Sequence, residues 1–99
     1  MLTSKQRAIL RSEASRMDAI FQIGKGDVNE AAVKSIGDAL EARELIKISV
    51  LQNSEADPRL TAEDLAEQTG SEVVGVIGRK IILFKVSEKP EKRRISTLI

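Results

Sequence analysis

The apolar residues of this chain change their spacing along the sequence, and this alternation is the strongest constraint on its fold. Residues 3–17 place apolar side chains at helical spacing, whereas residues 45–51 alternate between apolar and polar side chains, as a half-buried strand does. Helical and strand-like segments then follow one another to about residue 86. Helices that alternate with strands are typical of a sheet with parallel strands, because each parallel connection needs a crossover.

Local signals predict where the elements begin and end. Thr3 and Gln6 form a capping box that starts a first helix, and Asn29 is a good N-cap for a second. Thr61 is expected to cap a third helix, which Gly70 ends. Short strands are expected at residues 19–23, 45–51, 72–77 and 80–86.

The resulting order, α-β-α-β-α-β-β, predicts a single α/β sandwich of three helices and a four-stranded mixed sheet. Gly78-Arg79 joins the last two strands as a two-residue turn with glycine first, as a type II′ hairpin requires. Gly37 lies inside the second helix, where a close approach to another element is the expected reason for a glycine. The domain is expected to cover residues 1–86, followed by a basic, loose tail over residues 87–99.

Composition narrows the chemistry that this chain can perform. Its 99 residues include no Cys, His, Tyr or Trp, and no motif for another catalytic arrangement is present. We therefore expect no enzyme activity, metal site, cofactor or small-molecule substrate. No apolar run approaches the roughly 20 residues that span a bilayer, so we expect no membrane partner and a cytoplasmic location.

The charges are distributed unevenly. Residues 1–25 carry five basic and two acidic side chains, and residues 79–99 carry seven basic and two acidic ones. Residues 26–78 carry four basic and eleven acidic side chains. If the two ends of the chain meet in space, they form a basic face that attracts a polyanion.

Four segments in order carry a resemblance to a known family: LTSKQR (2–7), IFQIGKG (20–26), ALEARELIK (39–47) and VIGRKIILFK (76–85). Together they resemble the bacterial YhbY proteins, which are stand-alone CRM (chloroplast RNA splicing and ribosome maturation) domains. The resemblance covers nearly the whole chain. It implies a fold similar to the C-terminal domain of translation initiation factor three, RNA binding, and association with precursors of the large ribosomal subunit.

The family's signature is a GxxG loop between the first strand and the second helix, which here reads Gly24-Lys25-Gly26-Asp27. Glycines let the backbone approach a phosphate closely, and the free amides of the following helix favour an anion there. Asp27 replaces the final glycine of the pattern. Its carboxylate repels a phosphate, and its side chain could occupy the helix amides that a phosphate would use.

We expect structured RNA, and ribosomal RNA in particular, to be bound through phosphate and shape. Phe21 and Phe84, the two aromatic residues, lie in apolar strand patterns and are expected in the core, which leaves no base-stacking platform. The run Lys92-Arg93-Arg94 could grip RNA if the tail becomes ordered. The predicted RNA-binding residues are Gly24, Lys25, Gly26, Arg7, Arg11, Lys34, Arg79 and Lys80.

Two other functions are open at this point. The acidic middle of the chain could dock a basic ribosomal protein while RNA contributes nothing. Residues 60–70 also resemble the first helix and turn of a DNA-binding helix-turn-helix. That second hypothesis needs residues 72–77 to form a recognition helix, although they are β-branched and begin with an acidic residue.

Overall fold

The computed structural model describes residues 1–24, 26–52 and 54–99 of the chain. The elements in order are α1 (Ser4–Ala14), β1 (Phe21–Ile23), α2 (Glu30–Arg43), β2 (Leu45–Val50), α3 (Pro58–Thr69), β3 (Glu72–Ile77), β4 (Lys80–Phe84) and two short 3-10 helices, η1 (Pro90–Lys92) and η2 (Ser96–Leu98). This confirms the predicted order α-β-α-β-α-β-β.

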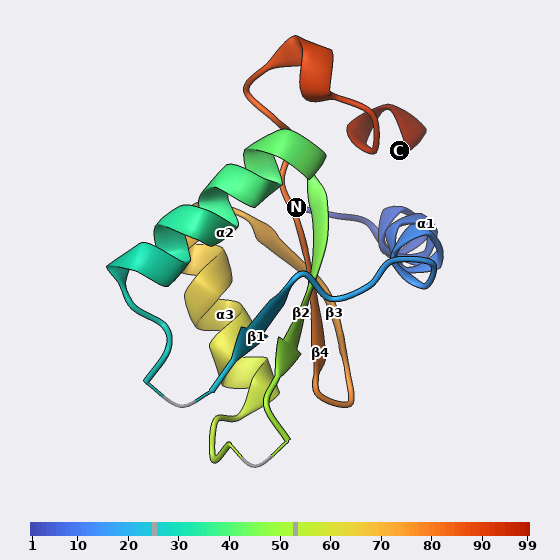
Figure 1. Cartoon of the computed structure of the whole chain (residues 1–99). Coiled ribbons are helices and arrows are strands. Elements are labelled where there is room, and N and C mark those ends of the chain that lie inside the picture. The colour runs from blue at the N-terminus through green and yellow to red at the C-terminus, as the bar shows by residue number, and fades with distance from the viewer. Residues whose placement is uncertain (25, 53) are drawn as a thin grey trace.

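The four strands form one mixed sheet in the order β1-β2-β4-β3 (Figure 1). β1 runs parallel to β2, whereas β4 is antiparallel to both β2 and β3. The turn between β3 and β4 begins at Gly78, whose φ of +59° is the left-handed conformation predicted for the first residue of this turn. The predicted mixed sheet with a closing hairpin is therefore confirmed.

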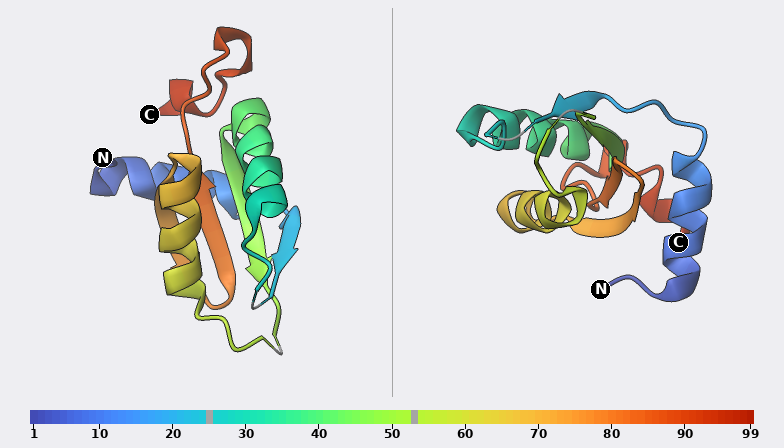
Figure 2. Two further views of the ribbon diagram at one scale, coloured as in Figure 1. Left: turned by 90° about the vertical axis from the view of Figure 1, so that its left-hand side faces the viewer. Right: turned by 90° about the horizontal axis from the view of Figure 1, so that it is seen from below.

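Helices cover both faces of the sheet. α2 and α3 lie side by side on one face and α1 lies on the other (Figure 2). The larger core cluster joins α2, α3 and the sheet through buried side chains: Ile23, Ile36, Leu40, Ile46, Ile48, Val50, Ala62, Leu65, Ala66, Ile81 and Leu83. A second cluster lies under α1. Phe84 is buried in it and Phe21 packs against the larger one, as predicted for both.

Several helix ends match the local signals in the sequence. The Gln6 backbone N–H donates to Thr3 Oγ1 at 3.1 Å and the Thr3 N–H donates to Gln6 Oε1 at 2.9 Å, which completes the capping box. Asn29 accepts a bond from the Ala32 N–H and caps α2. Gly70 ends α3 in the left-handed conformation.

Two local predictions are wrong. α3 begins at Pro58 rather than after Thr61, because Asp57 accepts the Arg59 N–H at 2.8 Å and a proline in the first helical position needs no hydrogen-bond acceptor. Gly37 has no close neighbour that would require a glycine, since a Cβ built there meets nothing within 4 Å.

Residues 87–99 lie against the body of the domain rather than extending as the loose tail that their composition predicted. Ile95 and Ile99 pack on the cluster that contains Leu10 and Ala14 of α1. The two basic ends of the chain therefore meet, which is the condition under which the charge pattern predicted a basic face (Figure 2). The predicted domain boundary after residue 86 stays a prediction.

Glu44, the C-cap of α2, holds this C-terminal segment. Its side chain is fully buried, and its carboxylate accepts the backbone N–H groups of Ser87 at 2.8 Å, Arg94 at 3.0 Å and Ser96 at 2.9 Å. The Ser96 hydroxyl donates a fourth bond at 3.0 Å. Burial by itself would raise the pKa of Glu44, but the amides of Ser96, Ser87 and Arg94 outweigh it, so the pKa lies below the ordinary glutamate value.

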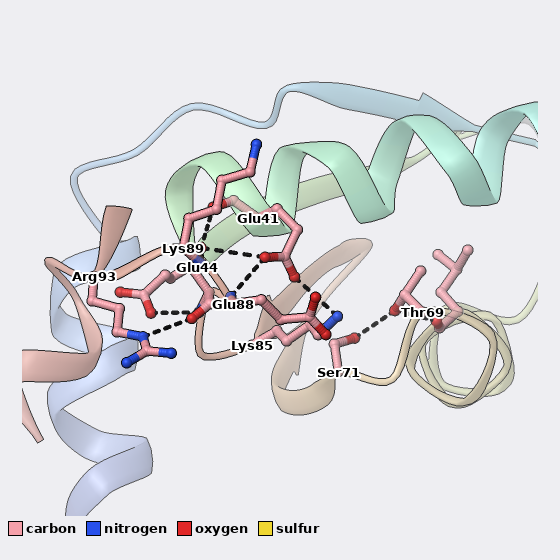
Figure 3. Close-up of polar contacts among 10 residues, drawn as sticks. Glu41, Glu44, Thr69, Ser71, Lys85, Glu88, Lys89 and Arg93 are labelled. Carbon is pink, nitrogen blue, oxygen red and sulfur yellow. Dashed lines mark hydrogen bonds and ion pairs between the residues drawn. The ribbon is translucent and has the colours of Figure 1, made fainter. Parts of the chain in front are cut away.

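Glu41, one turn earlier in α2, adds a second attachment (Figure 3). Its carboxylate accepts the Glu88 N–H at 2.7 Å and forms an ion pair with Lys85 at 3.0 Å. The Glu88 amide and the Lys85 ammonium lower the pKa of Glu41. Glu41 therefore joins α2 to the C-terminal segment as well as to Lys85.

Candidate nucleic-acid interface

Three connections meet at one end of the sheet. These are the loop after β1, the segment between β2 and α3, and the turn between β3 and β4 (Figure 1). The predicted site residues Gly24, Gly26, Arg79 and Lys80 all lie in or beside these connections. Lys25, the remaining predicted RNA-binding residue of the glycine loop, lies outside the described residues.

Asp27 closes the glycine loop on itself. Its carboxylate oxygen Oδ2 accepts the Gly24 N–H at 2.7 Å, and its own N–H donates to the Gly24 carbonyl at 3.1 Å. Gly26 sits between them with a φ of +85°, a conformation that favours glycine. The Asp27 side chain therefore occupies the amide of Gly24 in the loop itself. The helix amide of Ala32 donates to Asn29 and not to Asp27.

The loop rests on the segment that follows β2. The Leu51 N–H donates to the Ile23 carbonyl at 2.8 Å. A Cβ built on Gly24 would lie only 3.2 Å from Leu51 Cδ1 and 3.2 Å from Asp27 Oδ2. Any other residue at position 24 would therefore push on both neighbours, which gives this glycine a packing reason in addition to any role with RNA.

Arg79 fastens the same segment from the β3–β4 turn. Its Nη2 donates to the carbonyls of Leu51 at 2.9 Å, Ser54 at 3.2 Å and Ala56 at 3.3 Å. A flat guanidinium with several N–H donors is suited to such a set of backbone acceptors. Arg79 thus supports the platform under the loop, and much of its donor capacity is used inside the protein.

Lys80 lies beside this platform with its ammonium exposed. Lys80 Nζ donates to Ser49 Oγ at 3.1 Å. β1, β2 and β4 place Gln22, Ser49 and Lys80 in register on the sheet face on which α1 packs, at the end of that face where α1 does not line the surface. They line an open groove of about 390 Å³ together with Leu51 and Arg79. The groove offers a cation, an amide and a hydroxyl next to the glycine loop.

The remaining predicted cations are placed differently. Lys34, in the second turn of α2, forms an exposed ion pair with Asp38 at 3.1 Å. Arg7, on α1, donates to the carbonyls of Val73 and Val74 in β3. Arg7 therefore has a structural role, and the sequence prediction that it is a free RNA contact receives no support from its contacts.

Arg11 is exposed and lies in a groove of about 560 Å³ along β3, away from the glycine loop. Sequence reasoning did not single out Arg59 of α3, which lines the same groove. Glu63 and Glu72 line it too, so the groove mixes both signs of charge. The structure thus separates Arg7 and Arg11 from the loop instead of joining all predicted residues in one patch.

The polar positions Gln22 and Ser49 were also missed as site residues. The signal for Ser49 was the alternation of residues 46–50, and the signal for Gln22 was its place between Phe21 and Ile23; in both strands the polar side chain points away from the larger core cluster. Which of those outward positions stays uncovered depends on where α1 packs, and local sequence does not fix that.

Three structural observations bear on other classes of function. The segment after Gly70 is strand β3, so the recognition helix that a helix-turn-helix requires is absent and that hypothesis is wrong. Among the described residues, no group of three or more His, Cys, Asp or Glu side chains is placed to hold a metal ion. In that same part of the chain no helix is long and apolar enough to cross a membrane.

The fold and the loop define a class of protein: a small α/β domain with a glycine-containing loop between the first strand and the helix behind it. More narrowly, the chain belongs to the CRS1 / YhbY (CRM) domain family, whose model matches residues 2–85. The resemblance carried by the four sequence segments is therefore confirmed.

Relatives and a solved structure agree with this membership. The chain is 52% identical over 89 residues to Probable RNA-binding protein YqeI of Bacillus subtilis, an alignment that covers 90% of this chain and 93% of that protein. It is 31% identical over 102 residues to Probable RNA-binding protein MJ0652 of Methanocaldococcus jannaschii, with 93% and 75% covered. The solution structure of SAV1595 from Staphylococcus aureus matches with a TM-score of 0.77 and 50% identity, covering 95% of this chain and 98% of that one.

Proposed function

We propose that this protein binds structured RNA through the end of the sheet that carries the glycine loop, and that it acts on precursors of the large ribosomal subunit. The RNA is the ligand named for its relatives, and the ribosomal role follows from the family resemblance. The observation that carries the proposal is that Gly24 of the glycine loop lies against Leu51, which lines the same open groove as the exposed Lys80.

The groove is suited to a sugar-phosphate backbone rather than to stacked bases. Both phenylalanines pack in the core, so no aromatic side chain faces the groove. Lys80 supplies charge for a phosphate, whereas Gln22 and Ser49 supply hydrogen-bond partners for ribose and phosphate oxygens. We therefore expect weak sequence preference and an affinity that falls steeply as salt rises.

Two variants at Asp27 separate charge from loop geometry. Asp27→Asn keeps an oxygen that can accept the Gly24 N–H but removes the negative charge, whereas Asp27→Gly removes both. Removing one like charge near a phosphate at a partly exposed site is worth on the order of 1 kcal/mol, or several-fold in affinity. Both variants should bind RNA more tightly in a filter-binding titration, and Asp27→Gly should gain more if the freed Gly24 amide contacts RNA.

A matched loss is expected at Lys80. Lys80→Gln should weaken RNA binding and make the dependence of log affinity on log salt shallower by about 1, as for one phosphate contact. Lys34→Gln serves as the comparison because Lys34 is already paired with Asp38. If neither Asp27 nor Lys80 variants change RNA affinity, this end of the sheet is not the contact.

Sedimentation tests the ribosomal part of the proposal. In a cell extract at low salt, the protein should migrate with the large subunit or its precursor, and deletion of its gene should let precursors accumulate. Binding to a ribosomal protein by the acidic part of the chain, with no affinity for bare ribosomal RNA, would refute the RNA mechanism while retaining the association with ribosomes.

A further inference from the structure

A second group of cations lies at the opposite end of α2 from the glycine loop. Arg43 belongs to the last turn of α2, and Lys92 and Arg94 belong to the C-terminal segment. These three side chains, with Ala42 and Ile95, surround a hollow of about 270 Å³. Cations that are about 50 positions apart in the sequence therefore converge on one concave site, which we call the C-terminal groove.

The three cations are available to a ligand. All three residues are exposed, and within the described part of the chain none of their side chains forms an ion pair or donates a hydrogen bond. The neighbouring carboxylates of Glu41 and Glu44 are already occupied, by Lys85 and by backbone amides respectively. Glu88 and Glu91 are exposed on the same segment, but neither lines the groove.

The carboxylate of Glu44 fixes this arrangement. It accepts the backbone N–H groups of Arg94 and Ser96, so it positions the backbone of Arg94 while leaving the guanidinium free. A cation near the end of a helix also interacts favourably with the helix dipole, and Arg43 in the last turn meets that need. Lys92 and Arg94 add two further positive charges that the dipole of α2 does not account for. These charges surround a hollow whose position is fixed by the hydrogen bonds to Glu44.

We propose that the C-terminal groove is a second phosphate-binding site for the same RNA. This inference rests on the proposed RNA-binding function. α2 has 14 residues and therefore separates the two sites by about 21 Å at 1.5 Å per residue. An RNA that contacts both sites must span about this distance, so the groove sets a minimum size for a fully bound RNA and orients it on the protein.

The test compares two double variants that remove the same charge. Arg43→Gln with Arg94→Gln removes two of the three cations of the groove and leaves Lys92, whereas Lys5→Gln with Arg16→Gln removes two exposed cations from the α1 region. Affinity for a long structured ribosomal RNA is measured over a salt series, and thermal unfolding checks that both proteins are folded. The groove variant should bind several-fold more weakly, with a salt slope shallower by about 2, whereas the control should change the slope by less than 1.

A second measurement locates the contact directly. In NMR spectra of the labelled protein, added RNA should shift the amide signals of Arg94 and Ser96 as well as that of Gly26. Equal slopes for the two double variants, or shifts confined to the glycine loop, would overturn the second site while an effect at Asp27 still supported the proposed function. Absence of salt-sensitive RNA binding by the unchanged protein would overturn both. Loss of binding to anionic lipid vesicles in the groove variant, without any change toward RNA, would overturn the second site in favour of a membrane surface.

Discussion

Replacing Glu44 by glutamine tests how the C-terminal segment is held. The change keeps the size of the side chain but removes the charge that accepts four hydrogen bonds from Ser87, Arg94 and Ser96. A glutamine presents an NH₂ group in place of one oxygen, and this group faces N–H donors instead of accepting from them. At least one buried donor therefore loses its acceptor.

The magnitude follows from opposing terms. Hydrogen bonds to a charged group contribute about 1.5–3 kcal/mol each, but burying a carboxylate costs several kcal/mol. The loss also has a ceiling, because the segment can detach and let water satisfy its amides. We expect Glu44→Gln to lower the free energy of unfolding by about 2 kcal/mol, which for a domain of this size lowers Tm by about 10 °C.

Urea unfolding followed across pH provides the assay. The folded-state pKa of Glu44 lies below its ordinary value, so the stability it supplies is present above that ordinary value and is lost as pH falls through the folded pKa. The stability difference between the two proteins should therefore be largest near neutral pH and shrink in acid. Hydrogen exchange should show faster exchange at Ser87, Arg94 and Ser96 in the variant.

Two results would refute this reasoning. One is a stability difference below about 0.5 kcal/mol at neutral pH, which is within the range of ordinary surface substitutions. The other is a large loss of stability with unchanged protection of the Ser96 amide, which would mean that Glu44 acts on the end of α2 and not on the C-terminal segment. Glu41→Gln is the control for the exchange of the Ser96 amide. Glu41 accepts the Glu88 amide on the same segment but makes no contact with Ser96.

Three further predictions concern the scaffold. Gly37→Ala should raise the free energy of unfolding by about 0.5–1 kcal/mol in urea, because the added methyl group meets open space and alanine favours a helix; a loss would reveal a contact made only in solution. Asp57→Ala should lower the free energy of unfolding by about 1 kcal/mol, because it removes the cap of α3. Thr61→Ala should leave amide exchange at the start of that helix unchanged. Arg79→Lys should speed proteolysis between β2 and α3, since an ammonium cannot reach the carbonyls of Leu51, Ser54 and Ala56 together; equal cleavage rates would contradict the supporting role.

The sequence predicted the elements whose causes are local. Capping at Thr3 and Asn29, the stop at Gly70 and the turn at Gly78 each depend on atoms within a few residues, and all four are confirmed. The start of α3 was missed although its signal was equally local. Asp57 followed by Pro58 is a strong helix start, and the competing Thr61 lies one turn inside the helix.

The site was harder to predict because its cations have partners that are distant in sequence. Arg7 and Arg79 look like free basic residues in the sequence, yet both donate to backbone carbonyls of other elements. The residue type alone does not distinguish an arginine that donates to backbone carbonyls from one that binds a phosphate. The docking of residues 87–99 was missed for the same reason, since its main acceptor is Glu44, about 50 positions earlier in the chain.

The contact of Arg7 with β3 has a consequence for how this protein behaves in concentrated solution. β3 is one edge of the sheet, and an edge strand with free backbone groups is a template on which a second molecule can add a strand. Here a guanidinium from α1 already occupies carbonyls at Val73 and Val74, next to a register irregularity between Val73 and Gly75. The other edge, β1, is only three residues long. One edge is thus occupied at Val73 and Val74 and the other is only three residues long, and both features disfavour edge-to-edge aggregation of the folded chain.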